Sequence, residues 1–193
     1  MRNAEFDREK VLRSAMNAFM AKGYSKTSMQ DLTRATGLHP GSIYCAFDNK
    51  HGLFLAAIDQ YHADREQQLQ GFFPAEGSRL ECLRRYLDNI VSECLSCDTS
   101  QACLLVKALS EVGEQDLAVQ QRVSQHLQQW QTALQQILQQ AQAQGELAAD
   151  KDPAQLTRFL MMGIYGLRTY AHTRPSADEL RALATELFEH LSL

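Results

Sequence analysis

Apolar residues recur at intervals of three and four along most of this 193-residue chain. Leu12, Ala15, Met16 and Phe19 form the first such stripe, and their spacing is that of one face of an α-helix. The chain contains only four prolines and none of the Asn-Gly or Asp-Gly pairs that favour β-hairpins. The sequence therefore predicts an all-α fold of about nine helices.

Residues that favour helix starts and stops divide the chain into segments. Ser28 with Asp31, and Ser78 with Glu81, have the spacing of capping boxes, and Asp152 precedes a proline at a first helical position. With their caps included, the predicted helices cover residues 7–23, 28–37, 40–47, 50–70, 78–95, 103–112, 116–144, 152–170 and 175–191.

The charge of the chain is unevenly distributed. The whole sequence has a net charge of −4, which taken alone argues against a nucleic-acid partner. Residues 1–50, however, hold eight basic and five acidic side chains, so this segment is positive and the rest of the chain is negative. This asymmetry predicts two different functions on one chain.

Neither export nor membrane insertion is indicated by the sequence. No stretch approaches the roughly 18 uninterrupted apolar residues of a membrane span, and the first ten residues contain no apolar signal core. The five cysteines are an odd number without the spacing of a disulfide framework. We therefore expect a cytoplasmic protein with reduced cysteines and no membrane partner.

Residues 28–47 have the proportions of a helix-turn-helix unit. Two short predicted helices are separated by the tight turn 37–39, and the second begins with Pro40, Gly41 and Ser42. A helix-turn-helix unit places the start of its second helix in the major groove of DNA, where small or polar side chains are needed. These three residues meet that requirement.

The remaining residues of the unit divide into packing and contact positions. We expect Ile43 and Phe47 to face inward and seat the second helix, which leaves Tyr44 to direct its hydroxyl at the DNA backbone. Lys50 begins the next predicted helix, so its charge adds to the positive end of that helix's dipole at a phosphate. The sequence therefore predicts double-stranded DNA as a partner.

This pattern resembles the DNA-binding signature of the tetracycline-repressor (TetR/AcrR) family of bacterial transcription regulators. The resemblance covers residues 7–61 and rests on the segments TSMQDL at 27–32, GL at 37–38 and GSIY at 41–44, with Phe47, Lys50 and Leu53. It implies a base-reading segment formed by His39, Pro40, Gly41 and Ser42. It also implies phosphate contacts from Thr27, Ser28, Tyr44 and Lys50.

The resemblance further implies a domain organisation. Residues 1–50 would form the helix-turn-helix domain, 51–70 a connecting helix, and 71–193 a helical domain that binds a small-molecule inducer and dimerises through its last two helices. The break in helical pattern at residues 71–77 agrees with this boundary. The expected function is a DNA-binding regulator, most simply a repressor released from its operator by an inducer or by thiol modification, and not an enzyme.

The last two predicted helices are rich in apolar residues. Their stripes exceed what one small domain can bury, so we expect a homodimer, although a helix-rich monomer core remains an alternative. The candidate dimer residues are Gly163, Leu167, Leu180 and Leu187. Four further residues can line an apolar cavity for an inducer, and ordinary core packing is the alternative interpretation. They are Tyr86, Trp130, Met162 and Tyr165.

Three cysteines lie close together at residues 94, 97 and 103. The segment from Cys103 to Lys107 resembles a segment of TetR-type regulators that respond to oxidants or electrophiles, and a nearby lysine would favour the thiolate at Cys103. Burial of Cys103 as a small hydrophobe is the alternative. Cys94 and Cys97 also permit a redox or metal-binding protein, and a helical interaction module is a third possibility. We expect no metal and no cofactor, because no second Cys/His pair has zinc spacing.

Overall fold

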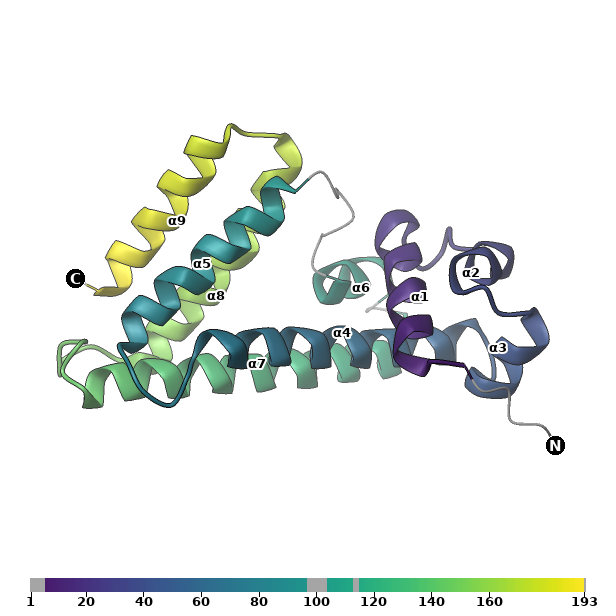
Figure 1. Ribbon diagram of the computed structural model, residues 1–193, viewed down its shortest axis with the longest axis horizontal. Coiled ribbons are helices and arrows are strands. Elements are labelled where there is room, and N and C mark those ends of the chain that lie inside the picture. The colour runs from purple at the N-terminus through teal and green to yellow at the C-terminus, as the bar shows by residue number, and fades with distance from the viewer. Residues whose placement is uncertain (1–5, 97–103, 113–114, 193) are drawn as a thin grey trace. The chain divides into compact units, whose positions relative to one another are not determined.

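The computed structural model describes residues 6–96, 104–112 and 115–192, and every regular element within these ranges is helical (Figure 1). The α-helices are α1 (Arg8–Lys22), α2 (Met29–Thr36), α3 (Pro40–Phe47), α4 (Lys50–Phe72), α5 (Arg79–Leu95), α6 (Leu104–Val112), α7 (Leu117–Ala143), α8 (Pro153–Tyr170) and α9 (Ala177–Ser192). A short 3-10 turn, Ala171–Thr173, follows α8. Within the described ranges the all-α prediction and the expected nine helices are confirmed.

Side-chain caps explain where several helices begin. The carboxylates of Asp7 and Asp152 accept hydrogen bonds from backbone N–H groups of α1 and α8, at 3.1 and 2.9 Å. Ser28 and Asp31 form the complete capping box of α2, with a hydrogen bond in each direction. Each contact satisfies a backbone N–H that has no partner inside its own helix, so these starts follow from local sequence.

The capping of α5 differs from the prediction. The Ser78 hydroxyl accepts from the N–H of Glu81, but the Glu81 carboxylate contacts Arg84. Glu146 instead accepts hydrogen bonds from the Ser78 hydroxyl and from the N–H groups of Arg79 and Leu80, at 2.8 to 3.0 Å. Burial alone would raise the pKa of Glu146, but these donors outweigh it and hold the pKa below its ordinary value. A distant carboxylate therefore completes this cap.

The chain packs as two compact units. One, here called the N-terminal unit, combines Met1–Arg65 with Ala102–His126; the other, the C-terminal unit, combines Glu66–Gln101 with Leu127–Leu193. Both α4 and α7 pass from one unit to the other. The functional boundaries expected at residues 50 and 70 stay a prediction.

In the N-terminal unit, α1, α2 and α3 pack with the first part of α4 around a small apolar core. The fully buried residues include Phe19, Leu32, Ile43, Leu53 and Phe54. The Arg13 guanidinium of α1 donates two hydrogen bonds to Asp64 of α4, at 2.8 and 2.9 Å.

The same part of α4 is fixed to the start of α7. Asp59 of α4 contacts the guanidinium of Arg122 and, at 2.8 Å, Nε2 of His126. The His126 ring also stacks on His62, with ring centroids 4.1 Å apart. These contacts hold the first turns of α7 against α4 within the N-terminal unit.

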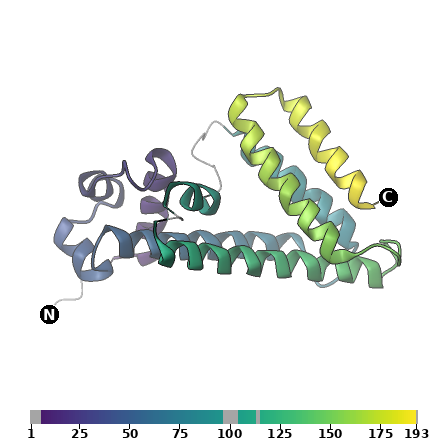
Figure 2. The ribbon, with the colours of Figure 1, turned by 180° about the vertical axis from the view of Figure 1, so that it is seen from behind.

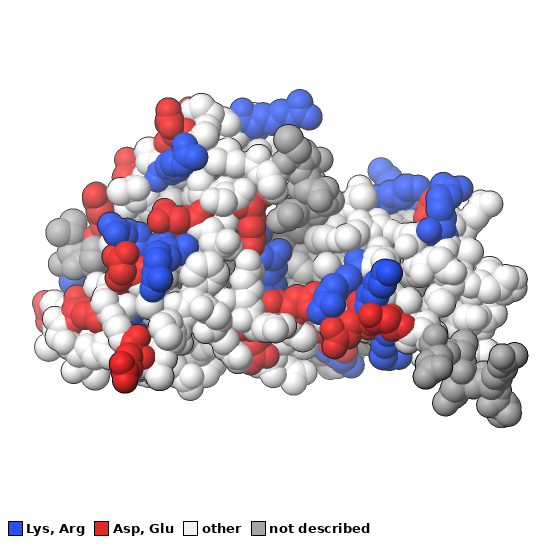
Figure 3. Space-filling view, in the orientation of Figure 1, with Lys and Arg blue, Asp and Glu red and all other residues white. Residues whose placement is uncertain are grey.

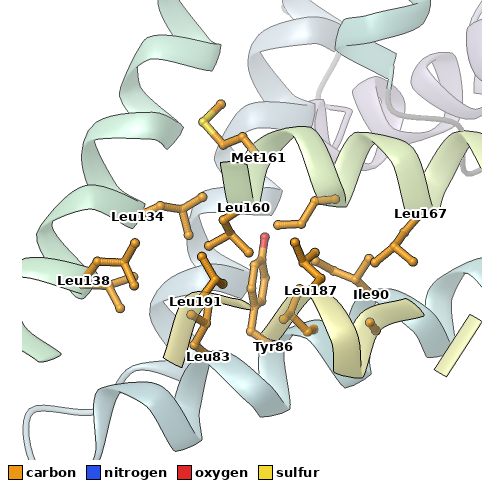
Figure 4. Packing of buried hydrophobic residues seen from close by; sticks show 14 of the residues in the cluster. Leu83, Tyr86, Ile90, Leu134, Leu138, Leu160, Met161, Leu167, Leu187 and Leu191 are labelled. Carbon is orange, nitrogen blue, oxygen red and sulfur yellow. The ribbon is translucent and has the colours of Figure 1, made fainter. Parts of the chain in front are cut away.

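In the C-terminal unit, α5, α8 and α9 pack on the later part of α7 (Figure 2). Tyr86 of α5 points into the apolar core between these helices, beside Leu160 and Leu191 (Figure 4). A Cβ on Gly163 would lie 2.5 Å from the Leu187 side chain, so this glycine allows α9 to approach α8. Gly166 faces open space within the described residues.

A charged pair is buried in the C-terminal unit. The Arg168 guanidinium donates to Oε2 of Glu93 at 2.9 Å, and the two side chains are only 10% and 15% exposed. The amides of Gln68 and Asn89 donate to Oε1 of the same carboxylate, at 2.5 and 3.0 Å. Glu93 thus joins residues from α4, α5 and α8 within one polar network.

Candidate nucleic-acid interface

The turn between α1 and α2 is shaped by Gly23 and Thr27. Gly23 ends α1 with φ +83° and ψ 161°, a backbone region that is essentially restricted to glycine. Thr27 is fully buried, and its hydroxyl donates to the carbonyl oxygen of Gly23 at 2.6 Å. The expected phosphate contact of the Thr27 side chain is therefore corrected: its hydroxyl is used inside the protein, where it holds the turn.

Ser28 lies at the exposed start of α2. Its hydroxyl belongs to the capping box with Asp31, and Lys22 of α1 also contacts Asp31 at 2.6 Å. The lysine, followed by the Ser28 donors, lowers the pKa of Asp31 well below its usual range. The capping box thus uses the backbone N–H groups of Ser28 and Asp31, and Ser28 remains exposed at the surface.

Helix α3 presents one face to the core and the other to solvent. Ile43 and Phe47 are buried, as expected, and Tyr44 is 49% exposed beside exposed Cys45. At the start of the helix, Nδ1 of His39 accepts from the N–H of Gly41 at 3.3 Å. His39 and Gly41 are exposed, while Pro40 and Ser42 are half-buried. The four residues expected to read bases therefore form the exposed start of a helix whose opposite face is fixed.

Lys50 begins α4 close to the end of α3. Its ammonium lies 4.4 Å from the ring centroid of Tyr24, and partial burial lowers the pKa of this lysine. The next residue, His51, contacts Asp116 through Nε2 at 2.6 Å. Gly52 then packs so closely on α3 that a Cβ there would lie 2.1 Å from the carbonyl oxygen of Phe47. These contacts fix where Lys50 stands relative to Tyr44.

Tyr24 is a residue of this region that sequence reasoning did not single out. Its ring lies among Phe19, His51 and Phe54, and its backbone N–H donates to the Glu111 carboxylate at 2.7 Å. Burial, and then the nearby Asp116 carboxylate, raise the pKa of its hydroxyl. The only sequence signal was an aromatic residue just after the α1 stop, which fits plain core packing equally well.

Basic side chains are exposed near the helix-turn-helix. In Figure 3, Lys and Arg side chains lie along the upper edge of the region of α1 and α2, while acidic and basic side chains are mixed below them and over the C-terminal unit. Nucleic acid attracts basic surfaces through its phosphates. The helix-turn-helix and its basic surroundings thus form one candidate DNA interface in the N-terminal unit.

The expected sensor residues fall in both compact units, with Lys107 in the N-terminal unit and Tyr86, Trp130, Met162 and Tyr165 in the C-terminal unit. Cys103 lies outside the described residues, as does Cys97. Lys107 of α6 donates to the carbonyl oxygen of Met20, at the end of α1, at 2.6 Å. Lys107 thus binds the last turn of α1, in line with the preference of helix C-termini for cations.

The candidate cavity residues have different surroundings. Trp130 and Tyr165 meet edge to face with ring centroids 5.7 Å apart, and both pack against the core cluster that contains Tyr86. Met162 is 63% exposed, whereas Met161 lies in the core. The expectation that Met162 lines an internal cavity is therefore corrected, because the neighbouring methionine occupies the inward position on α8.

The candidate dimer residues pack inside the chain. Leu167, Leu180 and Leu187 are buried in the C-terminal core, and Gly163 faces Leu187. The three leucines therefore expose little surface to a second copy, and a dimer contact through these four residues stays a prediction. The exposed residues of α8 and α9 include Met162, Gly166, Tyr170 and Leu183.

The described residues provide neither a metal-binding cluster nor a membrane-spanning helix. Within residues 6–96, 104–112 and 115–192, no group of three His, Cys, Asp or Glu side chains has an arrangement that can hold a metal ion. None of the helices in those ranges is long and apolar enough to cross a membrane.

Two family models match the chain. Residues 11–57 match the model described as "Bacterial regulatory proteins, tetR family", and residues 80–187 match "Tetracyclin repressor-like, C-terminal domain". The first match contains the helix-turn-helix, and the second contains most of the C-terminal unit. Together they match residues on both sides of the break at 71–77.

Individual relatives agree with these matches. The HTH-type transcriptional repressor ComR of Escherichia coli (strain K12) is 34% identical over 184 residues, which is 93% of this chain and 86% of ComR. The transcriptional regulator AcuR of Cereibacter sphaeroides is 27% identical over 191 residues, covering 97% of this chain and 86% of AcuR.

A solved structure shows the same fold with DNA bound. It is that of a cysteine-substituted variant of the TetR-family regulator CifR, complexed with 26-base-pair operator DNA. This neighbour has a TM-score of 0.85 and 28% sequence identity, and the match covers 97% of this chain and 98% of the other.

Proposed function

Because the chain belongs to the tetracycline-repressor (TetR) family of bacterial transcription regulators, we propose that it is a homodimeric repressor that binds operator DNA through α3. In this proposal, residues 1–50 bind DNA, 51–70 connect, and 71–193 sense a signal and dimerise, without enzymatic activity. Direct support comes from the relatives: ComR is named a repressor, and the CifR variant was solved with operator DNA.

One observation carries the DNA-binding proposal: α3 is exposed at its start and anchored at its back. His39, Gly41 and Tyr44 face solvent while Ile43 is fully buried. We assign His39, Pro40, Gly41 and Ser42 to base reading, and Ser28, Tyr44 and Lys50 to phosphates. Base contacts give specificity, while phosphate contacts hold the protein in register and make binding depend on salt.

Selection of DNA tests this function directly. The purified protein is incubated with a pool of randomised duplexes, and the bound duplexes are amplified through successive rounds. Enrichment of a defined sequence supports the proposal, and a protein that enriches none is not a sequence-specific regulator. The enriched duplex then serves as the probe for the variants below.

Replacing Lys50 with alanine is expected to weaken binding of the dimer to that duplex by about a hundredfold or more, because each protomer loses a charge-assisted phosphate contact of about 1.5–3 kcal/mol. The slope of log affinity against log salt concentration should also fall by about 2, because a dimer loses one phosphate contact in each protomer. Lys151→Ala, a lysine change in the C-terminal unit, is the matched control and should leave both unchanged. Equal behaviour of the two variants in a fluorescence-anisotropy titration argues against a phosphate contact at Lys50.

The proposed dimer surface is the outer face of α8 and α9. Met162, Tyr170 and Leu183 are large apolar side chains that are 63%, 41% and 40% exposed. Exposed apolar side chains on two packed helices are commonly covered by a partner, and a second copy of this chain can cover them by presenting the same face.

Leu183→Glu is therefore expected to convert the dimer to a monomer in sedimentation velocity, because it places a charge in an apolar contact. Leu117→Glu makes the same change at a 65% exposed leucine in the N-terminal unit and should remain dimeric. If Leu183→Glu sediments as the unmodified dimer does, the interface lies elsewhere.

The signal is proposed to be a small-molecule inducer or an oxidant or electrophile that modifies Cys103. The structure of the DNA-bound neighbour, CifR, carries substituted cysteines. In this chain the thiol proposal is tested by repeating the duplex titration with and without hydrogen peroxide, for the unmodified protein and for Cys103→Ser. If hydrogen peroxide still releases the Cys103→Ser variant from the duplex, then Cys103 is not the group that responds to the oxidant.

A further inference from the structure

The phosphate-contacting lysine proposed above rests on an aromatic ring. The Lys50 ammonium lies 4.4 Å from the centroid of the Tyr24 ring, within the range of a cation–π contact. The lysine is half-buried, so its long side chain is partly restrained along this ring. The position of the ammonium in the free protein therefore depends on the position of Tyr24.

Tyr24 is itself held on two sides. Its ring packs on Phe54, with centroids 4.6 Å apart, and on Phe19, with centroids 6.0 Å apart. Its backbone N–H donates to Oε2 of Glu111, which lies 87 residues further along the chain in α6. The ring and the main chain of Tyr24 are therefore fixed by different elements.

Glu111 is fitted closely to this turn. A Cβ on Gly23 would lie 2.3 Å from the Glu111 carboxylate, so the glycine leaves room for the carboxylate in the position it takes over the turn. Lys107, one helical turn earlier in α6, donates to the Met20 carbonyl at 2.6 Å. Two charged side chains of α6 therefore form hydrogen bonds here: Lys107 binds the last turn of α1, and Glu111 binds Tyr24 just after it.

We propose that Tyr24 is a positioning residue for DNA binding, which holds Lys50 at its phosphate, and that Glu111 in turn holds Tyr24. This inference rests on the proposed function. Neither residue contacts DNA in this scheme. Tyr24 acts by reducing the conformations that the Lys50 side chain must lose on binding, and Glu111 acts by fixing the turn that carries Tyr24.

A double-mutant cycle on the enriched duplex tests the role of Tyr24. Tyr24→Leu should weaken binding about fivefold, the fold-change that corresponds to a cation–π contact of ordinary strength. Tyr24→Phe retains the ring and should bind as the unmodified protein does. In a Lys50→Ala background, Tyr24→Leu should have no further effect, because the group it positions is gone. Additive losses in the two backgrounds would overturn the proposal.

Glu111→Ala provides a second test that does not alter the core. Removing an exposed negative charge ordinarily strengthens DNA binding, because it reduces repulsion from the phosphates. The proposal predicts the opposite sign, a loss of about threefold, which also disappears in the Lys50→Ala background. Glu76→Ala, an exposed acidic residue of the C-terminal unit, is the control and should not weaken binding. Unchanged or stronger binding by Glu111→Ala would overturn this step.

Failure of the two proposals can be told apart. If the unmodified protein enriches no duplex, the proposed function fails, and the inference fails with it before any variant is made. If a duplex is enriched but the cycle is additive, the function stands and the positioning role alone is wrong. Thermal unfolding of each variant identifies any Tyr24→Leu loss caused by misfolding, in which case the Glu111→Ala cycle decides.

Discussion

Glu93→Ala is expected to lower the free energy of unfolding of the protein by about 3–5 kcal/mol, because it removes the carboxylate from a buried ion pair. Arg168 is 10% exposed and would keep its charge after losing this contact. Gln68 and Asn89 would lose their acceptor at the same time. Urea denaturation followed by circular dichroism measures the change.

Two further variants serve as controls for Glu93→Ala. Asp178→Ala breaks the Asp178–Arg181 pair on the surface, where the side chains are 98% and 63% exposed, and should cost about 0.5 kcal/mol or less. The double variant Glu93→Leu with Arg168→Met replaces both charges by apolar groups and should recover most of the loss. If Glu93→Ala and Asp178→Ala are equally stable, the Glu93 network does not support the C-terminal unit.

Gly52→Ala is expected to destabilise the N-terminal unit by about 3 kcal/mol and to abolish DNA binding. The added methyl would meet the Phe47 carbonyl oxygen at 2.1 Å, a backbone atom that cannot move without shifting α3 or the first turn of α4. Tyr44 precedes this contact and Lys50 adjoins it, so either shift separates two proposed phosphate contacts. Denaturation and the duplex titration measure the two effects.

Gly71→Ala is the matched control for this glycine. Gly71 lies near the end of the same helix, α4, and a Cβ there meets nothing within 4 Å. Alanine should therefore stabilise the helix by about 0.5–1 kcal/mol, because it loses less conformational entropy than glycine. Similar losses in the two variants would show that the close approach at Gly52 is not the cause.

Helix positions in this chain were predictable because their signals are local. Asp7, Ser28 and Asp152 each bind N–H groups two or three residues away, so short sequence patterns contain the whole interaction. The inward direction of Ile43 and Phe47 was predictable for the same reason, since helical spacing places them on one face. The confirmed fold class and the helix-turn-helix both follow from signals of this range.

The contacts that escaped prediction join distant residues. Glu111 binds Tyr24 across 87 positions, and Glu93 binds Arg168 across 75, with no periodic pattern to pair them. Spacing also fails to separate Met161 from Met162, since the helix containing them is apolar on several sides. Thr27 was misassigned because a threonine in an exposed-looking turn can direct its hydroxyl inward as readily as outward.

The composition of the N-terminal unit has a consequence for engineering hybrid regulators. This unit takes residues 102–126 from the middle of the chain, and with them Lys107, Glu111 and Asp116. A chimera that joins residues 1–65 to the sensing half of another family member would therefore lack the native partners of Met20, Tyr24 and His51. A transplant that preserves these contacts needs three junctions, after residues 65, 101 and 126, because it carries α6 and the first turns of α7 together with the operator-reading segment.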